Sequence, residues 1–151
     1  MKRALATALL ALLLCSTAKA SDAEVKMAYL PEAGFFFWYP ASLAEQRTDD
    51  DGEVLLYAMD ASENELCILR YDADDGVTLD ALAASLQSDD ACADVSVADA
   101  KSIEYLTYTA EGNVNTVIVG DDGNLYEIML RGDGAFTQTA AELIRTTLSP
   151  G

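Results

Sequence analysis

The residue types that usually carry chemistry are unevenly supplied in this sequence, which has 26 Asp and Glu, three Cys and no histidine. Without histidine there is no Ser-His-Asp or Cys-His nucleophile, no histidine general base and no imidazole for typical zinc, copper or haem sites. The chain also has no glycine-rich phosphate loop. Carboxylate-pair catalysis remains open, but the acids gather at turns, where solvated side chains are the rule. We therefore expect a protein that is not an enzyme and needs no cofactor.

One acidic loop is similar to the opening of a calcium-binding loop. Asp72, Asp74 and Asp75 precede a glycine and offer the oxygen ligands that Ca²⁺ prefers. The spacing is one residue short, and Ala83 stands at the twelfth position, where a calcium loop has glutamate. The other acidic run, residues 49–51, is contiguous rather than alternating. We keep the three aspartates as a candidate cation site beside the simpler interpretation of a solvated turn, and we predict no other metal site.

Residues 1–20 have the features of an export signal. Two basic residues precede an uncharged stretch rich in Leu and Ala, residues 4–14, which is too short to span a bilayer. An A-x-A motif at 18–20 predicts cleavage there and a mature chain, 21–151, in the periplasm or secreted. The alternative is a lipoprotein attached through Cys15. It fits less well, because a leucine precedes that cysteine where lipoprotein signals have a small residue.

The two cysteines that remain after this cleavage are Cys67 and Cys92. In an oxidising compartment such a pair usually forms a bridge. We therefore predict a Cys67–Cys92 disulfide, which would tie the end of a helix to the strand before it. Free thiols or a metal pair are the alternatives.

The expected mature chain is strongly acidic. Six Lys or Arg stand against 26 Asp or Glu, which gives a net charge of about −20. Such a charge argues against nucleic acid and anionic membranes as partners. It permits a basic protein or a cation, and it also favours solubility.

A run of aromatic residues, Gly34–Pro40 (GFFFWYP), is the centre of the predicted core. Aromatic residues favour strands, and in a strand successive side chains point to opposite faces. Three rings would thus share one face, with Phe36 and Trp38 on the other. We predict a core strand, with an aromatic patch of Phe36 and Trp38 that binds a ligand as the alternative.

Hydrophobic periodicity and turn residues place the other elements in one domain, residues 21–151. Thr78 and Asp133 are natural N-caps for two helices. We expect strands at 27–30, 54–59, 65–71, 114–119 and 125–131, one or two more within 95–109, and helices at about 78–88 and 135–148.

Two motifs resemble those of the PsbP-like superfamily, which includes PsbP, Mog-type and DcrB-type proteins. The aromatic strand follows a Gly-Phe-x-Phe-x-Tyr-Pro pattern at 34–40, and an Asp-Gly-x-Leu-Tyr turn lies at 122–126. The resemblance implies an α+β fold, an antiparallel sheet of about six strands flanked by helices in an α/β/α sandwich. It implies little about activity. Metal sites in such relatives involve histidine, so none is carried over to this chain.

We therefore expect a small bacterial envelope protein that binds a protein partner without catalysis. It would act as an accessory module, or as an inhibitor or immunity-like protein whose acidic face meets a basic partner. The alternative is a periplasmic accessory protein that binds a small ligand or calcium.

Overall fold

The structure, a computed structural model, describes residues 24–47 and 52–151. The expected leader with Cys15, and the acidic run 49–51, lie outside these residues. Within the described ranges no helix has the length and apolar character needed to cross a membrane.

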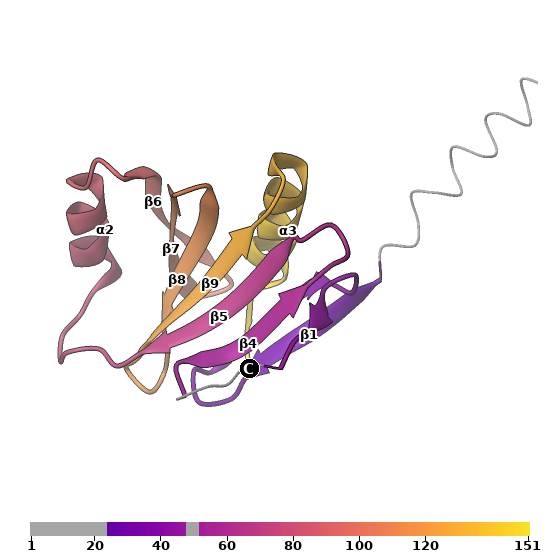
Figure 1. The fold of residues 1–151 in the computed structure, drawn as a ribbon. Helices are drawn as coiled ribbons and strands as arrows, with labels where there is room; N and C mark the ends of the chain where they lie inside the picture. Colours follow the sequence, from indigo (N-terminus) through magenta and orange to yellow (C-terminus); the bar gives the residue numbers. More distant parts are fainter. Residues whose placement is uncertain (1–23, 48–51) are drawn as a thin grey trace, which may run out of the picture.

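The described chain folds into two antiparallel sheets and two helices (Figure 1). The larger sheet has the strand order β3-β4-β5-β9-β8-β7-β6, and the smaller has the order β1-β2-β10. The elements are β1 (Val25–Leu30), β2 (Phe35–Pro40), β3 (Ala44–Glu45), β4 (Val54–Met59), β5 (Glu65–Tyr71), α2 (Leu79–Gln87), β6 (Cys92–Ala100), β7 (Ile103–Ala110), β8 (Asn113–Val119), β9 (Leu125–Arg131), α3 (Gly134–Thr147) and β10 (Ser149–Pro150).

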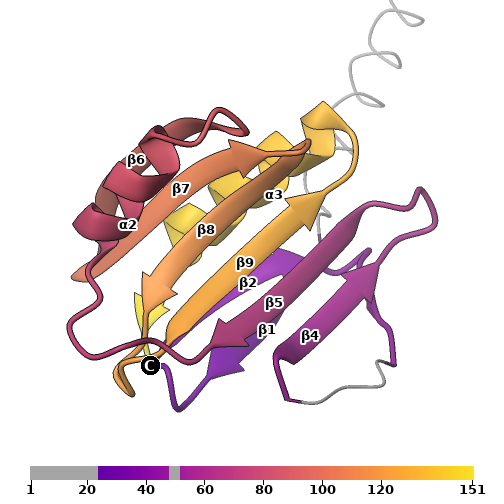
Figure 2. The ribbon, with the colours of Figure 1, turned by 60° about the vertical axis from the view of Figure 1, so that its left-hand side comes forward.

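The larger sheet is covered on both faces. Figure 2 shows α2 on its near side and α3 with the β1–β2 hairpin behind it. The α+β class, with helices on both sides of an antiparallel sheet, is as predicted. The larger sheet has seven strands rather than about six. Stretch 95–109 divides into β6 and β7 at Lys101 and Ser102, which both have positive φ, and the two-residue strand β3 is too short to give a periodic signal.

Two hydrophobic clusters hold these layers together. The main cluster lies between the larger sheet and the layer of β1, β2 and α3, and it contains Phe35, Phe37, Tyr39 and Tyr126. The Phe35 and Tyr126 rings meet edge to face with centroids 5.8 Å apart. The second cluster packs α2 on β7 and β8 through Leu79, Ala83, Leu106 and Val117.

Both predicted helix N-caps are confirmed. The Thr78 hydroxyl accepts a hydrogen bond from the Ala81 N–H at 3.2 Å, and the Asp133 carboxylate accepts one from the Phe136 N–H at 2.8 Å. Each cap satisfies an N–H group that the first helical turn leaves without an intrahelical partner.

The predicted Cys67–Cys92 disulfide is wrong. Cys67 lies in β5 and Cys92 begins β6, and strands β9, β8 and β7 stand between them in the sheet. Strands are spaced about 4.8 Å apart, so four steps separate the two residues by roughly 19 Å. A disulfide needs Cα atoms within about 7 Å. Helix α2 joins strands that are adjacent in the sequence but distant in the sheet, and the structure contains no bridge between these cysteines.

Candidate functional site

Strand β2 divides its aromatic side chains between two environments. Phe35, Phe37 and Tyr39 are 1%, 0% and 1% exposed, as predicted for a core strand. Phe36 and Trp38 alternate with them and are half-buried. Because side chains alternate along a strand, these two point to the outer side of the hairpin, away from the larger sheet. They are the residues named in the alternative interpretation of this run as a ligand-binding aromatic patch.

Strand β1 supplies the other half of this outer surface. Met27 lies opposite Trp38, and Tyr29 lies opposite Phe36. Directly opposed residues of an antiparallel pair share a face. Met27 and Tyr29 are 50% and 55% exposed. We call these four residues the aromatic face.

The aromatic face is held in place by the end of α3 and by β10. The backbone N–H of Trp38 donates to Thr147 Oγ1 at 2.9 Å, and the Thr147 hydroxyl donates to the Leu143 carbonyl at 2.7 Å. Ser149 of β10 pairs with Phe36. Since these contacts fix the backbone of β2, the rings on its outer side are displayed by a preorganised strand, which lowers the entropic cost of binding.

Sequence reasoning missed Met27 and Tyr29. The expected strand begins at Met27, whereas β1 begins at Val25, and the sequence pattern assigns no binding role to its outer side. The signal was present, because Val25, Met27 and Tyr29 make one face of the strand wholly apolar, while Ala28 and Leu30 lie on the other face. A strand of that kind needs a cover on each side, and only one cover is found among the described residues.

Exposed apolar side chains concentrate next to the aromatic face. Three of the large exposed hydrophobic residues lie in β1, and a fourth, Leu55 of β4, lines two grooves together with Tyr29. A contiguous exposed apolar surface marks an interaction site more often than scattered single residues do. The large exposed hydrophobic residues of the described chain are Val25, Met27, Tyr29, Leu55, Tyr71 and Val119.

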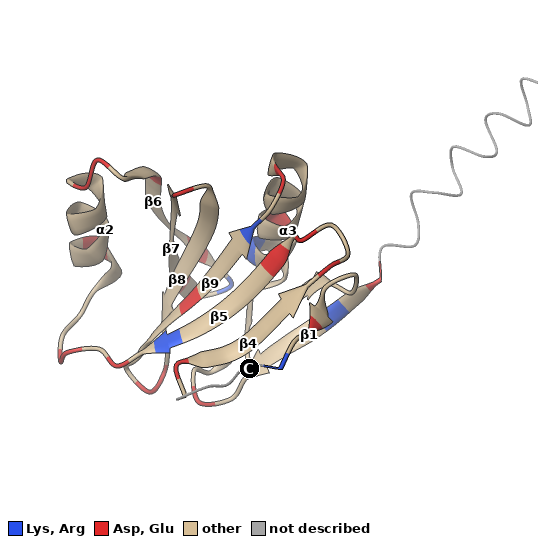
Figure 3. Ribbon diagram, viewed as in Figure 1, with Lys and Arg blue, Asp and Glu red and all other residues tan. Residues whose placement is uncertain are grey.

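The acidic residues are concentrated away from the aromatic face, although Glu24, Glu32 and Glu45 lie around the edge of β1. Strands β1 and β2 contain no carboxylate, whereas residues 72–111 contain ten Asp or Glu and a single cation, Lys101. Figure 3 shows these acids on α2, on β6 and β7 and in the loops around them. The molecule therefore has an acid-rich end and an acid-poor, apolar sheet.

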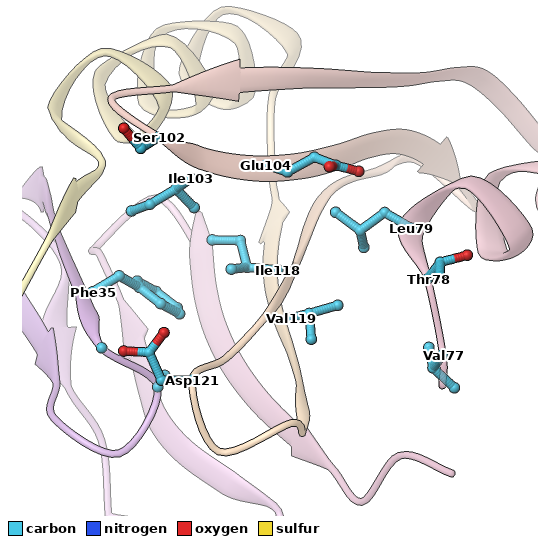
Figure 4. A pocket seen from close by; sticks show the side chains of 12 residues that line it. Phe35, Val77, Thr78, Leu79, Ser102, Ile103, Glu104, Ile118, Val119 and Asp121 are labelled. Atoms are coloured by element: carbon cyan, nitrogen blue, oxygen red, sulfur yellow. The ribbon is translucent and has the colours of Figure 1, made fainter. Parts of the chain in front are cut away.

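A separate pocket of about 330 Å³ lies where α2 begins, beside the β6–β7 and β8–β9 turns (Figure 4). The Asp121 N–H donates to the Ala33 carbonyl at 3.0 Å, and its side chain covers Gly34, where an added Cβ would lie 2.0 Å from Oδ2. Apolar walls with carboxylates suit a small molecule that has an apolar body and a positive group. The lining includes Phe35, Leu79, Ile103 and Ile118, the hydroxyl residues Thr78 and Ser102, and the acids Glu104 and Asp121.

The candidate cation loop connects β5 to α2. Asp72, Asp74 and Asp75 are exposed there, and Asp72 Oδ1 lies 3.7 Å from Arg70 Nη2. In the ranges that the structure describes, no group of three or more His, Cys, Asp or Glu is placed to hold a metal ion. The geometry thus adds nothing to the calcium hypothesis.

A glutamate on the α2 side of the larger sheet carries two tyrosine hydrogen bonds. Tyr71 Oη donates to Glu127 Oε2 at 3.1 Å, and Tyr108 Oη donates to Glu127 Oε1. Tyr71 is 39% exposed. Its partial burial and the Glu127 charge raise its pKa to about 12, and burial and the Glu127 hydrogen bond also raise the pKa of Tyr108. Both phenols are therefore protonated donors near neutral pH, which suits a structural role better than proton transfer.

The fold is similar to those of two solved structures. The solution structure of cyanobacterial PsbP (CyanoP) from Synechocystis sp. PCC 6803 matches with a TM-score of 0.57 and 14% identity, over 87% of this chain and 95% of that one. A crystal structure from Bacteroides thetaiotaomicron VPI-5482 matches with a TM-score of 0.53 and 16% identity, over 83% of this chain and 48% of that one, so this chain spans about half its length. No family model and no curated protein matches the sequence. At these identities the likeness shows the fold alone.

Proposed function

Starting from the PsbP-like fold of this chain, we propose that it is an exported, non-enzymatic module that binds a protein partner through the aromatic face. One observation carries the proposal. Met27 and Tyr29 are at least half exposed and share a surface with Phe36 and Trp38, so a hairpin with a packed inner side also displays a large apolar outer side.

The chemistry of this surface matches that of protein interfaces. Interface cores are enriched in aromatic residues and Met and depleted in Asp and Glu. Trp and Tyr are also the residues that most often carry binding energy. All four residues of the aromatic face belong to the enriched types, and neither of their strands contains an acid.

Two further features support an exported module with a basic partner. Residues 1–20 have the charge, length and cleavage motif of an export signal. The acid-rich stretch 72–111 would attract a basic protein from a distance and speed its encounter without lying in the contact itself.

The test is capture of a partner from envelope extract of the source organism, with the mature protein as bait. Trp38→Ser should weaken retention by roughly tenfold or more, because a buried interface aromatic is worth about 2 kcal/mol or more. Val119→Ser is the matched control, since Val119 is 36% exposed but lies outside the aromatic face. A partner retained equally by both variants would refute the proposed site. Higher salt should slow association, because it screens the acidic end.

A second candidate function is binding of a small organic cation in the pocket of Figure 4. Thermal melts with benzylamine and with benzyl alcohol compare a charged with a neutral ligand of the same shape. The amine should raise the melting temperature in a concentration-dependent way, and Glu104→Gln should reduce that shift. Equal shifts with both compounds, or none, would remove this candidate.

A further inference from the structure

We infer that the partner docks by strand addition: an extended apolar segment with flanking Lys or Arg pairs with the free edge of β1. The inference rests on the proposed function and specifies how that partner is held. Strand addition to a sheet edge gains affinity from backbone hydrogen bonds, and pockets for alternate side chains give specificity.

The hydrogen-bond pattern of the hairpin shows which backbone groups are available. The Ala41 N–H donates to the Glu24 carbonyl at 2.9 Å, so this opposed pair belongs to the hydrogen-bonded kind. The two kinds of pair alternate along an antiparallel ladder. Lys26, Ala28 and Leu30 therefore direct their backbone groups toward β2. The N–H and C=O groups of Val25, Met27 and Tyr29 point the other way.

These outward backbone groups have no partner within the described part of the chain. They belong to the residues of β1 whose side chains are 41%, 50% and 55% exposed. A partner strand can therefore contact both the backbone groups and the side chains of this edge, and three alternate residues of β1 can pair with it. An exposed apolar edge with this row of groups is a template for another strand.

The opposite edge of the fold, strand β6, is protected where β1 is not. Its register shifts between Ala93 and Ser96, and it carries Asp94 and Asp99. Bulges and charges of this kind discourage pairing at sheet edges. Strand β1 keeps a regular register over all six residues and contains no proline. Its one charged residue, Lys26, donates through Nζ to the Leu43 carbonyl at 3.4 Å.

Two adjoining grooves run beside this edge, between β1 and β4. Their volumes are about 320 and 230 Å³, and they share Tyr29, Leu30 and Leu55. Leu56 and Ile68 line the second groove and give it an apolar wall. The grooves can receive alternate side chains of an added strand. Met27 and Tyr29 of the aromatic face lie on the same strand and line the second groove.

Charge around the edge selects the kind of segment that would fit. Glu24 precedes β1, Glu32 lines the first groove and Glu45 lines the second. Lys26 is engaged with a carbonyl, so these carboxylates favour Lys or Arg on either side of the added strand. A second copy of this chain would bring the same three carboxylates and a like net charge to the contact, which disfavours self-pairing.

The first test uses a synthetic peptide, KVTVTVK, and the same peptide with backbone N-methyl groups at alternate residues. Amide hydrogen exchange followed by NMR should show fast exchange at Met27 and Tyr29 and slow exchange at Ala28 in the free protein. The unmodified peptide should slow exchange at Met27 and Tyr29 by roughly tenfold or more, and the peptide methylated on its pairing edge should not. Absence of protection at millimolar peptide, or equal protection by both peptides, would overturn the inference.

The second test uses variants of one residue. Met27→Pro removes an N–H from the free edge, where proline is tolerated, and Met27→Ala removes the same side chain but keeps the N–H. Peptide protection at Tyr29 should survive in Met27→Ala and be lost in Met27→Pro. If Met27→Pro fails to fold, the comparison of the unmodified and methylated peptides on the wild-type protein still tests strand addition.

The proposed function and the inference of strand addition can be refuted separately. Partner capture that depends on Trp38 but is equal for Met27→Ala and Met27→Pro would leave the proposed function standing and overturn strand addition. Capture insensitive to Trp38→Ser would refute the proposed function, whatever the peptide does. Sedimentation of the wild-type protein as a dimer that Met27→Pro dissociates would assign the edge to a second copy and overturn the hetero-partner inference.

Discussion

Met27 of β1 and Trp38 of β2 lie directly opposite each other, so a thioether and the only tryptophan of the chain share the outer side of one hairpin. Both belong to residue types that adapt to, or anchor, protein contacts. Trp38 is also tethered through its backbone to Thr147, at the end of α3. The indole is therefore a reporter for the proposed binding surface.

Trp38 should fluoresce as a partly exposed indole. Because it is half-buried on the outer side of β2, we expect red-shifted emission compared with a core tryptophan and ready quenching by acrylamide. Binding of the KVTVTVK peptide or of the captured partner should shift the emission to the blue, as water leaves the aromatic face. Blue emission and resistance to acrylamide in the free protein would contradict the exposure assigned to this face.

Phe36 and Phe37 form a matched pair for separating surface from core. Phe37 is 0% exposed, so Phe37→Ala should lower the free energy of unfolding by about 3–5 kcal/mol. Phe36→Ala, one residue away on the outer side, should cost roughly 1 kcal/mol and should weaken partner binding instead. Urea unfolding measures both values. Similar losses of stability in the two variants would show that the outer side is also packed.

Local features of this fold were predictable because local physics determines them. The alternation of the aromatic strand separates Phe37 from Trp38, and the side chains of Thr78 and Asp133 cap the two helices. In each case the deciding contacts lie within a few residues in the sequence. The class of fold was instead expected from the resemblance of two motifs, at 34–40 and 122–126, to those of the PsbP-like superfamily.

The long-range arrangement was not predictable in the same way. Helix α2 carries the chain from β5 in the middle of the larger sheet to β6 at its edge, and no periodicity encodes that crossing. The Cys67–Cys92 pairing failed for this reason. Phe36 and Trp38, half of the aromatic face, were expected on the second face of the core strand, with a ligand-binding patch as the alternative. The other half depends on the register between β1 and β2, which places Met27 and Tyr29 beside them.

Reducing agent should leave the stability of the protein unchanged. Removal of a native disulfide costs about 2–5 kcal/mol, and no bridge joins Cys67 to Cys92. Melting temperatures with and without dithiothreitol should therefore agree, and Cys92→Ser should behave like the wild type under both conditions. Mass spectrometry after alkylation under native conditions checks the thiol at Cys92. A melting temperature that falls on reduction would contradict this prediction and support the disulfide hypothesis.

The two tyrosines on Glu127 should make stability fall at alkaline pH. Partial burial, with the Glu127 carboxylate, raises the pKa of Tyr71 to about 12 in the folded chain, against about 10 when unfolded. A raised folded pKa means that the contribution is fully present below pH about 10 and is lost as the pH rises toward 12, because the unfolded chain releases its proton first.

Urea midpoints across this range, with tyrosinate absorbance as a second measurement, test the assignment. Tyr71→Phe should flatten part of the decline. Glu127→Gln keeps an acceptor but removes the charge, so it should lower the pKa of both Tyr71 and Tyr108. An alkaline decline that is identical in the wild type and both variants would place its origin outside this cluster. A smaller decline in both variants than in the wild type would establish that Glu127 and its two phenols stabilise the α2 side of the sheet.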